Sequence, residues 1–272
     1  MVSFLNFDAL WAEHVRNSDS ERMKDDEKER AFWKSFIAQR RSHSPDPSSR
    51  FVLEKILPVI HGYEIETGVE MGPGWGNYTL DLAKECKALD CVDISRDILD
   101  YILKISAEQG LANIRIIHAK WEDFSADKEY DLAFGYNCFY RQRSLKDCFA
   151  RMSAAAKKLC MAGMNSGPLP PWTREMTEEG AEPKCDGKDY IYFVNVLYQM
   201  GYLPQLMVLP FEKPLVYESR EALFRNEVSG RLKRELAPEK AMEILGKYFQ
   251  KNSQGFFTAK TQIHCGIVWW EP

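Results

Sequence analysis

The stretch Val69–Tyr78 reads V-E-M-G-P-G-W-G-N-Y and overlaps an apolar run, residues 65–71, that predicts a short strand. A helix is expected after Asn77. A second apolar run, L-D-C-V-D, ends on the carboxylate of Asp93. A strand, a glycine turn, a helix and a second strand ending in an acid form a nucleotide-binding half-site. The stretch therefore predicts an α/β fold built around a bound nucleotide.

The glycines of this turn determine which nucleotide fits. Gly72 and Gly74 let the backbone turn tightly and come close to a ligand. Gly76 and Asn77 lie at the helix start, where free N–H groups favour an anionic group. A dinucleotide fold would place the third glycine of G-x-G-x-x-G where this chain has Asn77. The spacing disfavours a nicotinamide or flavin cofactor without excluding it.

The pattern E-x-G-x-G-x-G, with Glu70 two places before the first glycine, resembles motif I of the class I S-adenosyl-L-methionine (SAM)-dependent methyltransferases. This resemblance implies SAM as the cofactor. It also implies a Rossmann-like, seven-stranded, mostly parallel sheet with helices on both faces and an antiparallel last strand. Gly72, Gly74 and Asn77 would then lie along the methionine part of SAM.

The same resemblance assigns the other end of the cofactor. Asp93 would hold the ribose, and Ile94 would pack on the adenine. The later segment A-K-W-E-D would place Trp121 and Glu122 beside the adenine edge, with Lys120 where the family often has an acid. The residues expected to bind the cofactor are Glu70, Gly72, Gly74, Gly76, Asn77, Asp93, Ile94, Trp121, Glu122 and Gly135.

The segment G-Y-N-C-F follows the fourth expected strand, where the family lines the methyl donor and acceptor. Gly135 is interpreted as a backbone contact to the methionine part, with Tyr136 and Asn137 facing the acceptor. Ordinary strand-end packing is the alternative. No N-P-P-Y or D-P-P-Y follows, which argues against methylation of amino groups on DNA bases. The catalytic residues stay unknown, with Tyr136, Asn137 and Tyr140 as candidates.

Alternating strand and helix patterns predict the organisation of the chain. Residues 1–50 are expected to form an N-terminal helical extension that ends in a linker at 42–49, and residues 51–272 a methyltransferase domain. Residues 166–188 are expected to be an exposed loop. The remaining expectations are strands near 65–71, 88–92, 114–118, 131–135, 158–163, 205–211 and 263–270, and late helices near 219–236 and 239–250.

The composition limits the functional class. The net charge of −4 argues against a protein that grips nucleic acid by its phosphates. No run approaches about 18 apolar residues, so no membrane span is expected, and no signal peptide is recognised. The seven cysteines contain no C-x-x-C pair and the five histidines are scattered. These features predict a cytoplasmic protein without a metal.

More narrowly, the chain resembles a poorly characterised group of prokaryotic methyltransferases with an N-terminal helical extension. The matching features are Phe32–Trp33, the helix D-Y-I-Y-F-V-N-V-L-Y-Q-M-G at 189–201, and Trp269–Trp270. This likeness supports the cofactor and leaves the acceptor open.

The leading hypothesis is methyl transfer to a small-molecule acceptor under a cover made by the loop at 166–188 and the N-terminal helices. The alternatives are a nicotinamide-dependent oxidoreductase and a non-catalytic SAM-binding protein. Arg40–Arg41 and the pair Arg141 and Arg143 are candidate contacts for an anionic acceptor, with a solvated surface as the favoured interpretation. The oligomeric state is not predicted.

Overall fold

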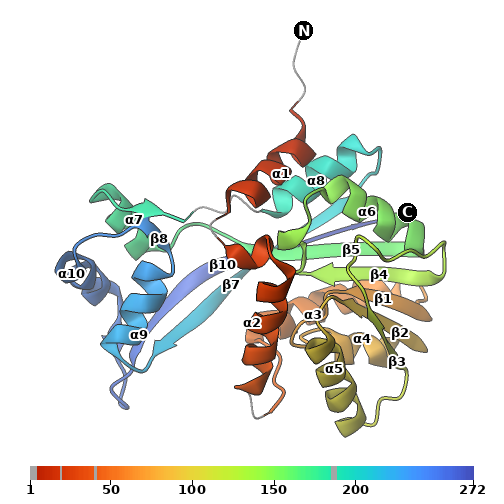
Figure 1. Ribbon diagram of the computed structural model, residues 1–272, viewed down its shortest axis with the longest axis horizontal. Helices are drawn as coiled ribbons and strands as arrows, with labels where there is room; N and C mark the ends of the chain where they lie inside the picture. The colour runs from red at the N-terminus through yellow and green to blue at the C-terminus, as the bar shows by residue number, and fades with distance from the viewer. Residues whose placement is uncertain (1–4, 19, 40–41, 185–188) are drawn as a thin grey trace. The chain divides into compact units, whose positions relative to one another are not determined.

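A computed structural model describes residues 5–18, 20–39, 42–184 and 189–272 (Figure 1). Arg40 and Arg41 lie outside the described residues. The chain divides into two compact units, and the boundary falls within two long strands, β7 (Gln205–Tyr217) and β10 (Phe257–Trp270). The first unit comprises residues 1–165, 187–209 and 265–272, and the second comprises 166–186 and 210–264.

A mostly parallel sheet organises the first unit. Its strands follow the order β3-β2-β1-β4-β5-β10-β7, and the short β9 (Gln250–Lys251) pairs with β10. The predicted fold is confirmed, including the last strand between the fifth and sixth expected strands. The first five strands are β1 (Thr67–Met71), β2 (Ala88–Asp93), β3 (Ile114–His118), β4 (Tyr130–Tyr136) and β5 (Ala156–Ser166).

The order of the strands reverses between β1 and β4, which pair in parallel with Met71 opposite Gly135. In open α/β sheets, ligands bind outside the carboxyl ends of the strands at such a switch point. Every residue of β4 is buried, as expected of a central parallel strand covered on both faces. The glycine turn after β1 and the segment after β4 therefore meet at one edge of the sheet.

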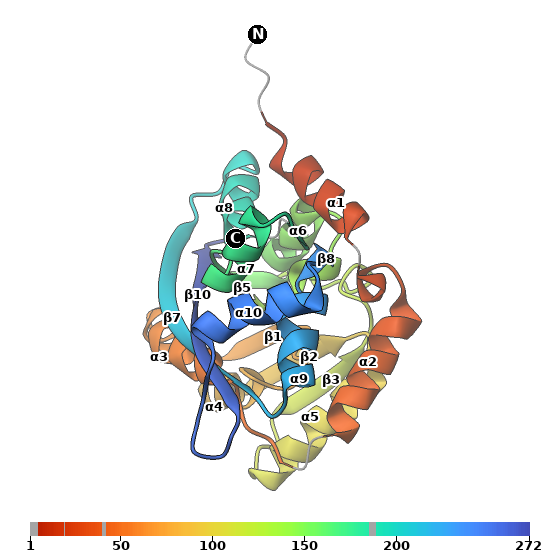
Figure 2. The ribbon, with the colours of Figure 1, turned by 90° about the vertical axis from the view of Figure 1, so that its left-hand side faces the viewer.

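Helices cover both faces of this sheet. α1, α6 and α8 gather on one side of the strands, and α3, α4 and α5 lie on the other (Figures 1 and 2). α2 packs beside α5. These helices are α1 (Phe7–Asn17), α2 (Asp26–Ala38), α3 (Pro47–His61), α4 (Thr79–Glu85), α5 (Arg96–Glu108), α6 (Leu145–Ala155) and α8 (Tyr190–Gln199).

Polar caps set the start of the helices near the glycine turn. Asp25 caps α2 by accepting hydrogen bonds from the backbone N–H groups of Glu27 (2.8 Å) and Lys28 (3.2 Å). Ser95 caps α5, because its side chain accepts a hydrogen bond from the N–H of Ile98. The caps fix the point at which α2 and α5 begin.

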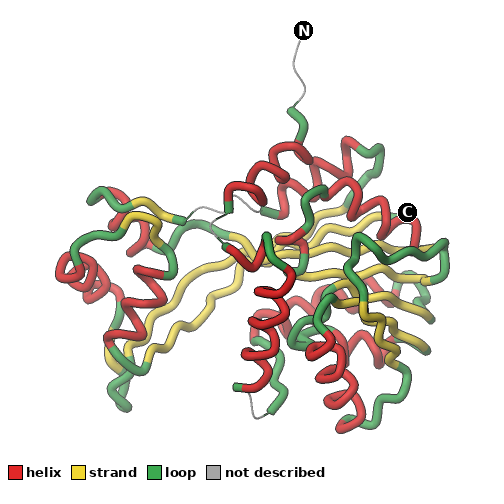
Figure 3. The backbone as a smooth tube through the Cα atoms, viewed as in Figure 1, coloured by secondary structure: helices red, strands yellow, loops and turns green. Residues whose placement is uncertain are grey.

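Two predictions for the second unit are wrong. The expected loop at 166–188 contains a helix, α7 (Pro171–Glu178), whose Trp172 and Met176 are buried. The expected helix at 219–236 is interrupted, because β8 (Leu232–Arg234) pairs with β6 (Glu182–Pro183). Helix and strand appear in red and yellow in Figure 3. The other elements are α9 (Arg220–Phe224), the π-helical η3 (Arg225–Ser229) and α10 (Pro238–Tyr248).

These errors have a physical cause. The proline and charge content of 166–188 is typical of loops, yet Trp172 and Met176 lie four residues apart and share one helix face. That face packs into a separate hydrophobic core with Leu223, Ile244 and Leu245. Within the described part of the chain, no helix has the length and apolar character needed to cross a membrane.

Candidate functional site

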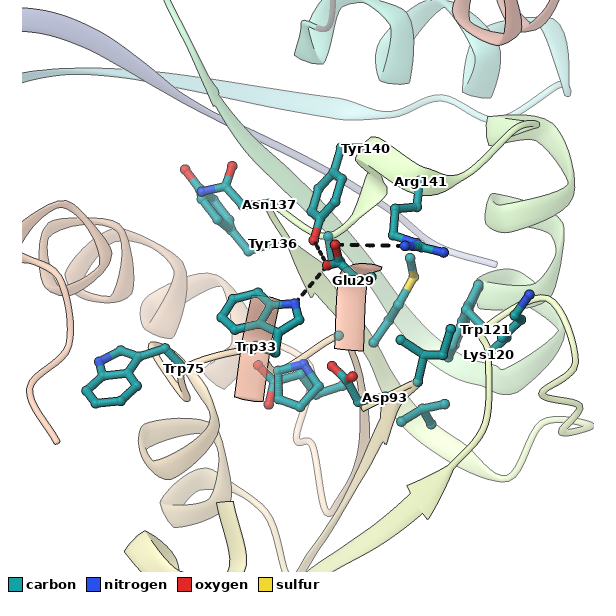
Figure 4. Close-up of a pocket in the computed structure, with 18 of the residues that line it drawn as sticks. Glu29, Trp33, Trp75, Asp93, Lys120, Trp121, Tyr136, Asn137, Tyr140 and Arg141 are labelled. Atoms are coloured by element: carbon teal, nitrogen blue, oxygen red, sulfur yellow. Dashed lines mark hydrogen bonds and ion pairs between the residues drawn. The ribbon is translucent and has the colours of Figure 1, made fainter. Parts of the chain in front are cut away.

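A cavity of about 220 Å³ lies in the first unit at the carboxyl ends of the strands (Figure 4). It brings together most of the residues that the sequence singles out. Gly76 and Gly135 are the predicted site residues that do not line it. Those that do are Glu70, Gly72, Gly74, Asn77, Asp93, Ile94, Trp121, Glu122, Tyr136, Asn137 and Tyr140.

The glycine turn has the backbone geometry that only glycine adopts easily. Gly72 has φ +59° and Gly74 has φ +51°. A Cβ added at Gly72 would stand 2.7 Å from the Cβ of Cys138, so the turn and the segment after β4 are in direct contact. The N–H of Gly72 donates to the carbonyl of Val92 at 2.9 Å. The turn is thereby tied to β2.

Gly76 and Gly135 allow close packing behind the cavity. A Cβ at Gly76 would meet Ile102 at 2.9 Å, and one at Gly135 would meet Cys138 and Phe139 at 3.0 Å. Their predicted contacts with the cofactor stay predictions.

Asp93 ends β2 as a buried carboxylate at the wall of the cavity. Its Oδ1 accepts a hydrogen bond from the N–H of Ser95 at 2.7 Å. Burial raises the pKa of Asp93 to about 7, and the nearby Glu29 carboxylate also raises it, whereas the Ser95 N–H lowers it. A carboxylate has several lone pairs, so it can still accept hydroxyl groups from a ligand.

Glu70 lies on β1 just before the glycine turn and is 2 % exposed. Burial raises its pKa to about 7, and the charge of Asp93 contributes in the same direction. Two buried acids therefore flank the turn.

The Asn77 side chain has partners within the protein. Its Oδ1 accepts the backbone N–H of Asp46 at 3.0 Å, and its Nδ2 donates to the Asp46 carboxylate at 3.2 Å. Asn77 thus connects the glycine turn to the residue that precedes α3. Because the side chain bonds Asp46, the predicted contact of Asn77 with the methionine part of SAM would come from its backbone.

The region predicted for adenine contains Ile94, Trp121 and Glu122. Trp121 is 5 % exposed, and its ring stacks on Phe124 with centroids 5.1 Å apart. Its indole N–H donates to the carbonyl of Cys148 at 3.4 Å. Lys120 forms an ion pair with Asp26 of α2.

The segment after β4 is held by Asn165 at the end of β5. The Tyr136 hydroxyl donates to Asn165 Oδ1 at 2.7 Å, and Asn137 Oδ1 accepts the N–H of Asn165 at 2.7 Å. Asn137 has φ +55°, an uncommon backbone conformation for a residue other than glycine. Burial raises the pKa of Tyr136 above its ordinary value of 10, which keeps the phenol protonated.

The sequence predicts that N-terminal helices cover the acceptor, but it assigns none of the α2 residues to the site. Glu29, Trp33 and Phe36 line the cavity, and Glu29 is 1 % exposed. The Arg141 guanidinium binds the start of this helix: it donates hydrogen bonds to the carbonyls of Arg22 and Asp25 and forms an ion pair with Asp26. The available signal was the four-residue spacing of Glu29 and Trp33 within an otherwise charged helix.

The donor set fits SAM. Gly72 and Gly74 adopt the left-handed conformation and carry no Cβ, so their backbone can approach the methionine part closely. The Asp93 carboxylate can accept hydrogen bonds from two ribose hydroxyls. Ile94 and Trp121 offer apolar surface for the adenine. Among the described residues, no cluster of three or more His, Cys, Asp or Glu side chains is arranged to ligate a metal ion.

Comparisons with known proteins bear on the family and the fold. Residues 69–158 match the family model of a methyltransferase domain. A putative methyltransferase from Bacillus halodurans C-125 has the same fold, with a TM-score of 0.54 over 81% of this chain and 98% of that chain at 13% identity. An uncharacterized protein of Haemophilus influenzae is 23% identical over 224 residues, which cover 80% of each chain.

A third similarity is local. The chain is 40% identical over 78 residues to the ribosomal RNA small subunit methyltransferase A of Coxiella burnetii, and this segment covers 29% of the chain and 30% of that protein. The chain thus spans less than a third of the length of that relative.

The family match places residues 69–158 among methyltransferase domains, and the solved structure shows that the chain has a methyltransferase-like fold. SAM, the cofactor that the glycine turn predicts, agrees with this match over residues 69–158.

Proposed function

We propose that this protein transfers the methyl group of SAM to a small-molecule acceptor. The supporting observation is the cavity, whose wall includes Glu29, Trp33 and Phe36 of α2 as well as the glycine turn. The cavity lies at the switch point of the sheet, where open α/β folds bind their ligands, and it brings the predicted cofactor residues together with these α2 side chains. In this proposal the N-terminal helices cap the acceptor.

The residues of the glycine turn and of β2 hold the cofactor. The backbone at Gly72 and Gly74 lies along its methionine part, and Asp93 accepts its ribose hydroxyls. When bound, SAM supplies a methyl carbon activated by its sulfonium. Glu70 is buried beside the turn, and burial raises its pKa to about 7, so its acidic group is partly protonated at neutral pH.

The chain has to align the acceptor and exclude water. A lone pair of the acceptor atom forms the new bond to carbon as the carbon–sulfur bond breaks, and any acceptor proton passes to water. Tyr136, Asn137 and Tyr140 orient the acceptor by hydrogen bonds. The raised pKa of Tyr136 makes this phenol a poor general base at neutral pH.

RNA is a second candidate acceptor because of the local identity to the ribosomal RNA methyltransferase. The net charge of −4 disfavours it. In addition, both basic residues among the described lining of the cavity, Lys120 and Arg141, are paired with Asp26. Small molecules remain the favoured class.

The test uses SAM labelled in its methyl group and three acceptor pools from bacterial cells: low-molecular-weight metabolites, total RNA and total protein. We expect label in the metabolite pool. Label in RNA or protein alone would contradict a small-molecule acceptor. Binding of S-adenosylhomocysteine (SAH) without transfer to any pool would favour a non-catalytic SAM-binding protein.

A further inference from the structure

Glu29 concentrates hydrogen bonds at the wall of the cavity (Figure 4). Its carboxylate accepts the Tyr140 hydroxyl at 2.5 Å and the Trp33 indole N–H at 2.7 Å. Arg22 donates to the same carboxylate through Nε at 2.9 Å and Nη2 at 3.2 Å. Arg141 adds an ion pair at 3.8 Å. One acid of α2 thus joins the helix to the segment after β4.

Burying a carboxylate such as Glu29 costs free energy, and packing of the helix alone does not require a carboxylate at this position. A buried carboxylate is tolerated only when it is paired and hydrogen-bonded, and an apolar residue of similar size often stabilises a fold as well. Here the paired acid does not lie in the hydrophobic core. It faces the cavity beside Asp93, whose pKa it helps to raise.

The bond to Glu29 determines what the Tyr140 hydroxyl can offer a ligand. A phenol has one proton to donate, and Tyr140 gives it to Glu29. Burial, assisted by the Glu29 charge, raises the pKa of Tyr140 above its ordinary value of 10, so the proton stays on the oxygen. Within the described part of the chain, one further hydrogen bond reaches this oxygen, a long one of 3.5 Å from Arg22. The oxygen therefore has lone-pair capacity for a donor in the cavity.

We propose that Glu29 is a positioning residue for the methyl acceptor. It holds the Trp33 and Tyr140 rings in the cavity wall and directs the Tyr140 proton away from the acceptor, so that the Tyr140 oxygen receives an N–H or O–H of the acceptor. This inference rests on the proposed function and narrows its substrate class to amines and hydroxyl compounds methylated on nitrogen or oxygen.

The chain contains a matched control. Glu227 of the second unit is also buried and accepts the indole N–H of Trp172 at 2.8 Å, the hydroxyl of Tyr217, and Arg231 Nε at 2.6 Å. Its partners are of the same three types, but Glu227 is not among the described residues that line the cavity. Glu29→Gln and Glu227→Gln therefore remove equivalent charges from equivalent networks.

The experiment measures methyl transfer to the labelled pool, SAH affinity by calorimetry and the melting temperature for each variant of the full chain. Both glutamine variants are expected to melt lower than the wild type. Only Glu29→Gln should lose transfer, by at least about tenfold, with its SAH affinity kept within about threefold. Tyr140→Phe should show a similar loss, and the double variant should be no slower than Glu29→Gln, because the two residues act as one unit.

Four results would overturn the inference: wild-type transfer by Glu29→Gln, an equal loss in Glu227→Gln, a fall in SAH affinity that matches the fall in rate, or independent, multiplicative effects of Glu29→Gln and Tyr140→Phe. A labelled product with its new methyl on carbon or sulfur would overturn the substrate class. If the wild type labels only RNA, the small-molecule function fails, and the same variants on RNA still decide the role of Glu29.

Discussion

The Trp33 indole of α2 lies directly against Gly74 of the glycine turn. A Cβ placed on Gly74 would stand 3.2 Å from the Cη2 atom of Trp33. Gly74 also has φ +51°, which side chains with a Cβ rarely adopt. The N-terminal helix and the turn predicted to hold SAM are therefore parts of one wall, and Gly74 meets both a backbone and a packing requirement.

Gly74→Ala should weaken SAH binding by at least about tenfold, because the new methyl group strains the turn and pushes on Trp33. The backbone strain alone costs about 1–3 kcal/mol of stability. Gly110→Ala is the control, since Gly110 has φ +71° and no atoms within 4 Å of the added Cβ. Calorimetric titration should find SAH affinity unchanged in Gly110→Ala. An equal loss in both variants would mean that the turn does not contact the cofactor.

The buried acid Glu70 should make stability depend on pH. Burial raises its pKa to about 7 in the folded protein from its ordinary value of 4.5, so the folded state binds the proton more tightly. The free energy of unfolding should therefore fall as pH rises from about 4.5 to 7, by up to about 3 kcal/mol from this group. Glu70→Gln should remove this contribution and gain on the wild type between pH 5 and pH 8.

Urea unfolding at several pH values checks this expectation, with the exposed Glu54→Gln of α3 as the control. The difference between Glu70→Gln and wild type should grow with pH, whereas that of Glu54→Gln should stay flat. Parallel curves for Glu70→Gln would show that Glu70 titrates normally.

Arg141 should hold the start of α2 in place. It bonds the carbonyls of Arg22 and Asp25 and the carboxylate of Asp26. Arg141→Ala should raise amide hydrogen exchange in residues 26–38, because those contacts are lost. The exposed Arg143→Ala is the matched control. If exchange rises equally in both variants, Arg141 does not fix the helix.

The sheet was predictable because its signals are local. Glycine spacing, Asp93 at a strand end and alternating apolar runs depend on neighbours in the sequence. β8 was missed because its pairing with β6 joins residues about 50 apart and overrides helix propensity. The helix α7 was missed because the proline and charge content of its surroundings masks the Trp172–Met176 face.

The candidate site was predicted in the same uneven way. The turn, Asp93 and the segment after β4 meet in one cavity. The four-residue spacing of Glu29 and Trp33 indicates only a shared helix face, because the main partner of Glu29, Tyr140, lies 111 positions later in the sequence. Arg141 had the same difficulty: in the sequence it is a basic residue near a loop, and in the fold its charge is used by Asp26.

The glycine turn and Asp93 are proposed to bind SAM. The most direct measurement is the thermal shift of the wild type and Asp93→Asn with saturating SAH and, separately, NADH, with the exposed Asp97→Asn as control. SAH should stabilise the wild type and Asp97→Asn. Asp93→Asn should bind SAH at least about tenfold more weakly, a difference of about 1.4 kcal/mol. NADH should have no effect. Stabilisation by NADH but not SAH would show that the site binds a nicotinamide cofactor. Undiminished SAH binding by Asp93→Asn would show that Asp93 does not hold the ribose.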